Sequence, residues 1–185
     1  LVPVMDGEPR VQKPPLYYWL GAAVGALEGE LTPFALRLPA VLFALALLGV
    51  VLRWGGSLGG PAAGALAALS LACMAQFWSI GRRGVAEMPL AASCVAALYL
   101  FDRIYWGGRR RLLPLFFLAA LVGFLAKATA AMLVIGLPIA VQLVRDRSVR
   151  RLWRADLLGW AGCTAAAAIA WYAALWLLVP EGRAG

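Results

Sequence analysis

Long apolar runs alternate with short polar junctions along most of the chain, and this pattern predicts helices that cross a membrane. A bilayer needs about 20 apolar residues for each spanning helix, and the chain supplies several such runs in series. Only helices and closed barrels satisfy their backbone groups in hydrocarbon, and the alternation typical of barrel strands is absent here. We therefore predict an all-α, polytopic transmembrane helical bundle with about six spanning helices and one interfacial helix.

The predicted spans are separated mostly by glycine or arginine residues. In chain order they are Phe34–Arg53, Pro61–Ile80, Glu87–Tyr105, two short helices within Leu112–Val144, and Leu157–Val179. The stretch 112–144 is too long for one span and is interrupted only by Lys127, so we expect a hairpin that turns there. The glycines at positions 55, 56, 59 and 60 predict a tight turn between the first two spans.

The amino-terminal segment differs from the rest because it is polar up to residue 13. Pro14 and Pro15 then precede an apolar run that ends at Glu28 and is too short to span. Its first residues, Tyr17, Tyr18 and Trp19, are of the types that favour a membrane–water interface, so we predict a surface helix over 14–28. The expected organisation is an outer-side loop and interfacial helix over 1–33, a transmembrane domain over 34–179, and the start of an outer loop over 180–185.

Composition and charge narrow the class of protein further. A hydrophobic content of 63% and a mean hydropathy of +0.82 exclude an ordinary water-soluble domain. The net charge of +8 comes from arginines in short loops, chiefly 103–111 and 145–154, so it indicates membrane topology rather than nucleic-acid binding. We expect a multi-pass protein of a bacterial inner (plasma) membrane, with those loops cytoplasmic. The chain has no histidine, and we predict no cofactor and no metal site.

A set of charged residues falls on the opposite, non-cytoplasmic side of the predicted bundle. Its members are Lys13, Arg37, Arg82, Arg83, Glu87 and Lys127. The positive-inside rule does not explain basic side chains on this side, and an anionic ligand would explain them. A lipid-linked phosphate fits, because arginine offers a bidentate fork and lysine a point charge. Lys127 carries most weight, since a lone lysine in an apolar stretch costs several kcal/mol unless it reaches water or a partner.

Structural explanations compete with this interpretation. Lys13 can anchor among lipid headgroups, and Arg83 with Glu87 can form a salt bridge at i, i+4 near a helix start. The aromatic residues 17–19 fit an interfacial belt as well as a surface that stacks against a sugar. The residues alone therefore predict a membrane protein with a cationic outer site, and no reaction.

Several motifs resemble bacterial glycosyltransferases of the GT-C type, the superfamily of the protein O-mannosyltransferases and the aminoarabinose transferase of lipid A. They are LVPVMDGEPRVQKPPLYYWL at 1–20, RLPA at 37–40, GRRGVAEMPL at 81–90, GFLAKATAAMLVIGLP at 123–138 and AWYAALWLLVP at 170–180. The KPPLYYW string is fairly specific, whereas the other motifs gain weight from their order along essentially the whole chain.

The resemblance implies transfer of a sugar from a polyprenyl-phosphate-linked donor to lipid A, a protein or another glycan, at the outer face of the inner membrane. Lys13, Arg82, Arg83 and Lys127 then correspond to donor-phosphate ligands, Glu87 to their polar partner, and Tyr17, Tyr18 and Trp19 to substrate-surface aromatics. The family's catalytic acid is expected upstream of Leu1, so the chain is expected to be an internal, inactive part of a longer protein.

Two departures from the family pattern bear on this assignment. Many relatives carry Asp where this chain has Glu87, and the aminoarabinose transferases carry an acid where it has Gln12. The second departure argues against metal binding there and against that particular substrate. A transporter or flippase for an anionic lipid-linked substrate is the main alternative, and it predicts broken helices near the bilayer midplane. A purely structural membrane subunit would tolerate the loss of Lys127 and Arg82.

Overall fold

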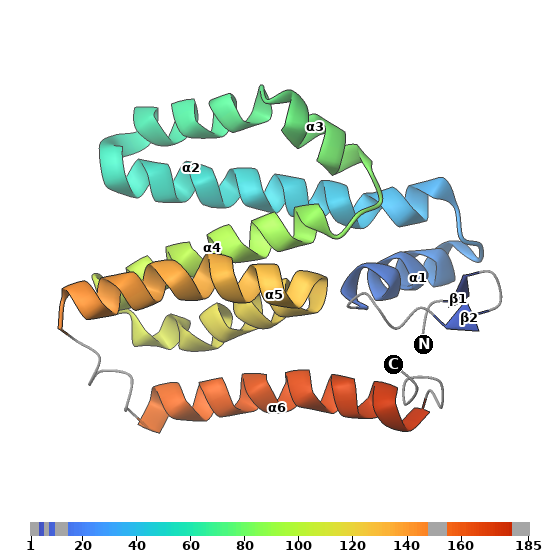
Figure 1. The fold of residues 1–185 in the computed structure, drawn as a ribbon. Helices are drawn as coiled ribbons and strands as arrows, with labels where there is room; N and C mark the ends of the chain where they lie inside the picture. The colour runs from blue at the N-terminus through green and yellow to red at the C-terminus, as the bar shows by residue number, and fades with distance from the viewer. Residues whose placement is uncertain (1–3, 6–7, 10–14, 148–154, 179–185) are drawn as a thin grey trace.

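The computed structural model describes residues 4–5, 8–9, 15–147 and 155–178, and these are almost entirely helical (Figure 1). The elements are β1 (Val4–Met5), β2 (Glu8–Pro9), α1 (Leu16–Glu28), α2 (Pro33–Ala72), α3 (Ala75–Arg82), α4 (Glu87–Tyr105), the 3-10 turn η1 (Arg110–Leu112), α5 (Leu113–Arg145) and α6 (Ala155–Leu178). The two short strands pair antiparallel. The predicted all-α class is confirmed.

Helix α1 is the helix predicted over 14–28, and hydrogen bonds at its end fix the turn into α2. Gly29 ends the helix in the left-handed region at φ 85°, where glycine has no steric penalty. Thr32 then caps α2, because its hydroxyl accepts from the Ala35 N–H at 3.0 Å and donates to a Glu28 carboxylate oxygen at 2.6 Å. The turn is thus determined by local chemistry.

Helix α2 consists of two arms that fold back on each other at Gly60. This residue has φ 86° and ψ 171°, which only glycine adopts readily. A Cβ built on Gly64 would overlap the Leu52 carbonyl and lie 2.6 Å from the Gly56 nitrogen. Residues eight apart in a straight helix are about 12 Å apart, so this contact shows that the arms run antiparallel. The predicted glycine turn is confirmed.

The prediction of one continuous helix over Pro61–Ile80 is wrong. The chain leaves helical geometry at Cys73 and Met74, so α2 ends at Ala72 and α3 begins at Ala75. The Trp78 indole N–H donates to the Ala72 carbonyl at 2.5 Å across this bend. The run is apolar on both sides of the bend, and no proline or glycine marks it in the sequence.

Helix α5 also reverses direction, at the position predicted from Lys127. That residue has φ −162° and ψ 86°, an extended conformation inside an otherwise helical segment. A Cβ on Gly123 would lie 3.3 Å from the Cβ of Ala131, eight residues further along, so the two arms face each other. Figure 1 shows them side by side, in yellow and orange. The predicted hairpin is confirmed.

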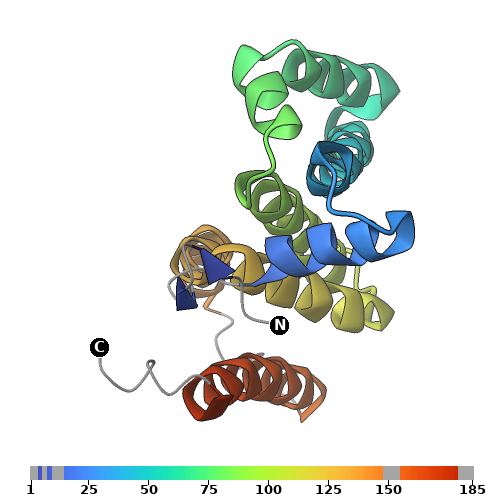
Figure 2. The same ribbon diagram turned by 90° about the vertical axis from the view of Figure 1, so that its right-hand side faces the viewer.

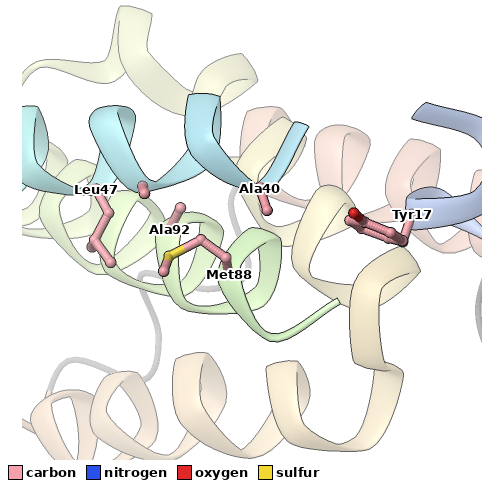
Figure 3. Packing of buried hydrophobic residues seen from close by; sticks show 6 residues of the cluster. Tyr17, Ala40, Leu47, Met88 and Ala92 are labelled. Carbon is pink, nitrogen blue, oxygen red and sulfur yellow. The ribbon is translucent and has the colours of Figure 1, made fainter. Parts of the chain in front are cut away.

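The helices stack from the α2 hairpin through α4 and α5 to α6, as the end-on view in Figure 2 shows. One core cluster joins α1, α2 and α4; Figure 3 shows Met88 and Ala92 beside Ala40 and Leu47, with Tyr17 at one end. A second cluster joins α4 to the second arm of α5 and includes Ala97, Ala131 and Ile135. Alanine at the contacts lets helix backbones approach closely, as is usual where lipid surrounds the bundle.

Length and composition identify the elements that fit a bilayer. Within the described residues, α2 and the segment Arg110–Arg145 are long and apolar enough to cross, and α3 with α4, bent by 117°, would make a third span. These are two or three candidate spans where the sequence predicts about six, and each of the two long ones is divided into two arms, at Gly60 and at Lys127. The apolar stretch Leu158–Trp171 of α6 is shorter. The chain is therefore a membrane protein by the character of its helices.

Candidate functional site

The two ends of the bundle carry different groups. One end holds α1, the start of α2, the junction between α3 and α4, and the turn of α5 (Figure 1). The opposite end holds the Gly60 turn, the end of α4, η1, and both the start and the end of α5. The arginines at 103–111 and Arg145 thus lie at one end, and Arg82, Arg83, Glu87 and Lys127 lie at the other. The fold therefore has these two sets of charged residues at opposite ends of the bundle, as the sequence predicts. Which end faces the cytoplasm stays a prediction.

The centre of the site is an ion pair between two helices that are distant in sequence. The Lys127 ammonium nitrogen lies 3.8 Å from a Glu87 carboxylate oxygen, and the two side chains are 57% and 47% exposed. A pair this exposed adds little to stability, about 0–1 kcal/mol. Both groups remain accessible to a ligand, so the pair is better placed for binding than for holding the fold together.

Local structure explains why these two residues meet. Glu87 is the first residue of α4, where a carboxylate is stabilised by the positive end of the helix dipole. Lys127 occupies the break of α5, where its side chain is 57% exposed and lies 3.8 Å from Glu87 instead of being buried between the arms. The break therefore removes the energetic problem that a lysine in a long apolar stretch would pose.

The two arginines before α4 flank this pair without joining it. Arg82 is the last residue of α3, Arg83 follows it in an extended conformation, and both side chains are exposed. Among the described residues neither forms an ion pair. The i, i+4 salt bridge between Arg83 and Glu87 is absent, because the helix begins only at Glu87 and the required geometry does not exist. Two cations are thus left exposed in the same junction as the Glu87 carboxylate.

Gly84 fixes the position of this junction against α1 and α2. The Tyr17 hydroxyl donates a hydrogen bond to the Leu36 carbonyl. A Cβ on Gly84 would lie 2.8 Å from that hydroxyl and 3.3 Å from that carbonyl oxygen, so a larger residue would push the junction away. Burial raises the pKa of Tyr17 above its ordinary value of 10.0, so the hydroxyl remains a donor further into the alkaline range.

The aromatic residues of α1 divide into two environments. Tyr17 is only 6% exposed and belongs to the core, so it differs from the surface position expected of a substrate-facing aromatic. Tyr18 and Trp19 are partly buried, and the Trp19 ring meets Trp171 of α6 edge-on, with centroids 4.6 Å apart. Contact of residues 18 and 19 with a substrate stays a prediction. Lys13 lies outside the described residues.

The site offers cations and one carboxylate, and this limits its chemistry. Within the described ranges, no three His, Cys, Asp or Glu side chains come together in a way that could hold a metal ion. The exposed groups Arg82, Arg83 and Lys127 can stabilise negative charge on a phosphate, and Glu87 can accept a hydrogen bond or a proton. The sequence predicts that all four residues lie at one end of the bundle. No pattern in the sequence predicts the ion pair between Glu87 and Lys127.

Together, the fold and the site define a class of protein: a helical membrane protein with a cationic polar site at one end of its bundle. A family model described as dolichyl-phosphate-mannose-protein mannosyltransferase matches residues 12–178. The chain belongs to this family, a group of GT-C-type membrane glycosyltransferases, so the resemblance seen in the motifs is confirmed. No curated protein and no solved structure matches the chain significantly.

Proposed function

We propose that this chain forms part of a membrane glycosyltransferase that transfers a sugar from a polyprenyl-phosphate-linked donor to an acceptor hydroxyl on lipid A, a protein or a glycan. The observation that carries the proposal is the exposed lysine at the α5 break, paired with Glu87 of a junction that also carries the exposed Arg82 and Arg83, in a chain of the mannosyltransferase family. The site would lie at the outer face of an inner membrane, with the arginine-rich end of the bundle cytoplasmic.

The chemistry needs two contributions from the protein. As the bond between sugar and phosphate breaks, negative charge grows on the phosphate, and Lys127 with Arg82 or Arg83 would stabilise it. A carboxylate would take the proton of the acceptor hydroxyl, and the family resemblance leaves that role to an acid other than Glu87. Glu87 then serves as the partner that holds the Lys127 ammonium in place when no phosphate is bound.

The transporter alternative predicts broken helices near the bilayer midplane. The structure does contain breaks, but those at Gly60 and Lys127 lie at the ends of the bundle, where the chain reverses. The bend at 73–74 is flanked by apolar residues and carries no charge. Among the described breaks, two carry charged residues: the one at Lys127 and the 117° bend between α3 and α4, which holds Arg82 and Arg83. Both belong to the proposed phosphate site.

The test uses the full-length protein in proteoliposomes with a radiolabelled polyprenyl-phosphate mannose. We expect label to move to an acceptor with the wild type, and both Lys13→Ala and Lys127→Ala to lose donor binding. Arg53→Ala is the matched control, since Arg53 is an exposed cation of α2 only seven residues before the Gly60 turn, which lies at the opposite end of the bundle. Failure of the donor to bind or react, together with passage of a solute across the bilayer, would replace this proposal with the transporter.

A further inference from the structure

An apolar cavity of about 520 Å³ lies between the two arms of α5 and helix α6. Phe116 and Phe124 from the first arm of α5 and Ile139 from the second form much of one wall. Thr164 is the only lining residue with a polar side-chain group, and its hydroxyl already donates to the Trp160 carbonyl at 2.9 Å. The cavity therefore suits a hydrocarbon and offers almost nothing to a polar ligand.

The cavity exists because one face of α6 is lined with small residues. Ala161, Thr164, Ala165 and Ala168 follow the i, i+3, i+4, i+7 spacing of a single helix face. Large side chains at these positions would fill the space against α5. Figures 1 and 2 both show α6 alongside α5. The α5 residues that line the cavity extend from Phe116 to Phe124 on the first arm and from Ala131 to Ile139 on the second, so the cavity follows much of the hairpin.

The cavity extends towards the candidate phosphate site. Its lining includes Phe124 and Ala131, which lie three residues before and four residues after Lys127 on the two arms of the hairpin. At a rise of about 1.5 Å per residue, those positions are only about 5–6 Å from Lys127 along the helix axis. An amphiphile with its phosphate at Lys127 would thus have an apolar space close by for the first part of its chain.

We propose that this cavity holds the phosphate-proximal part of the donor's isoprenoid chain and sets how much of that chain the protein recognises. The inference rests on the proposed function, and it adds a limit on the length of isoprenoid chain that the protein recognises. A cavity of about 150 Å³ accommodates benzene, or about 25 Å³ per carbon. On that scale 520 Å³ accommodates about four isoprene units of five carbons each. The rest of a longer chain would remain among the membrane lipids.

The experiment measures KM for a series of synthetic donors of one to eight isoprene units with the full-length wild-type protein in detergent micelles. The chain moves from other hydrocarbon into the cavity, so the gain comes from packing, and we expect KM to fall by about three- to tenfold in total. The fall should end near four units and KM should then stay constant. A KM that does not depend on chain length would overturn the inference and leave the cavity to a phospholipid chain or another helix.

Two substitutions on α6 provide a matched pair for the same assay. Ala165→Phe fills the cavity, whereas Ala167→Phe adds the same side chain on the opposite, exposed face of the helix. We expect Ala165→Phe to abolish the length dependence and Ala167→Phe to retain it, with thermal unfolding used to check that both fold. A length dependence that survives in Ala165→Phe would also overturn the inference. Absence of transfer from every donor to any acceptor would refute the proposed function itself.

Discussion

The two hairpin turns of this chain solve the same geometric problem with different residues. At Gly60 an apolar helix reverses through a positive φ that glycine adopts without steric cost. At Lys127 an equally apolar helix reverses through an extended residue with a charged side chain and no special backbone preference. The first turn is explained by backbone chemistry alone, and the second is not.

The surroundings of the two turns explain the difference. Gly60 is followed by close backbone contact between Gly64 and the opposite arm, and the hydroxyl of nearby Ser57 donates to the carbonyl of Trp54 in its own helix. Lys127 instead meets Glu87 of α4 and lies at the end of the bundle that also carries Arg82 and Arg83. A lysine at a turn is therefore best understood through what it binds, and a glycine turn through how closely its arms pack.

The largest expected effect is on folding, at the glycine turn. Gly64→Leu should prevent the arms of α2 from closing, because its Cβ alone would overlap the Leu52 carbonyl. We expect a loss of about 3 kcal/mol or more in the free energy of unfolding, measured by thermal denaturation in detergent. Gly56→Ala is the control, since a Cβ there meets nothing within 4 Å. Equal stability of the two variants would show that the arms do not pack as described.

At the lysine turn we expect a large effect on activity and a small one on folding. Lys127→Met should reduce sugar transfer by about 100-fold, the usual order for removing a group that stabilises charge in the transition state. Its unfolding midpoint should change little, because the ion pair with Glu87 is half exposed. Sugar transfer and denaturation are measured on the same Lys127→Met preparation. A variant that is strongly destabilised but keeps its activity per folded molecule would show that Lys127 acts on folding and not on transfer.

Tyr17→Phe tests whether the site end of the bundle also depends on one buried hydrogen bond. We expect a loss of about 1 kcal/mol, since the substitution removes only the bond to the Leu36 carbonyl. The folded-state pKa of Tyr17 lies above the ordinary value of 10.0. The stabilisation that the protonated hydroxyl gives to the folded state is therefore complete below pH 10, and it is lost as pH rises through the folded-state pKa. Unfolding measured from pH 8 to 11 should accordingly show less alkaline destabilisation in Tyr17→Phe than in the wild type.

The smallest effect should come from Glu87→Gln. The exposed pair with Lys127 predicts a stability change below about 1 kcal/mol, measured by the same denaturation curves. Glu87→Asp retains the charge on a shorter arm and serves as its control. A loss of several kcal/mol in Glu87→Gln alone would mean that the pair is structural after all.

The sequence predicts those parts of the fold that are marked by distinctive residues. Helix α4 begins and ends as predicted, because Glu87 before Pro89 marks its start and the arginine loop follows its end. Both hairpin turns are predictable for the same reason. The bend at Cys73–Met74 is not, since it lies in an apolar run and depends on how α3 packs beyond it.

The candidate site was predictable as a set of residues and not as an arrangement. Counting predicted spans brings Arg82, Arg83, Glu87 and Lys127 to one side, which the fold reproduces. The ion pair between Glu87 and Lys127 depends on the angle and depth at which α4 meets the α5 hairpin, and no local pattern encodes those. The burial of Tyr17 likewise depends on α2 lying over α1.

The role that we propose for the break at Lys127 is to present a cation to a lipid phosphate. Its most direct test is equilibrium binding of a polyprenyl phosphate, without sugar, to the full-length wild type, Lys127→Met and Lys127→Arg in detergent. We expect at least about tenfold weaker binding by Lys127→Met and near wild-type binding by Lys127→Arg, because only the methionine variant lacks the charge. Equal affinity of the wild type and Lys127→Met would contradict the claim and leave the lysine with no role at the site.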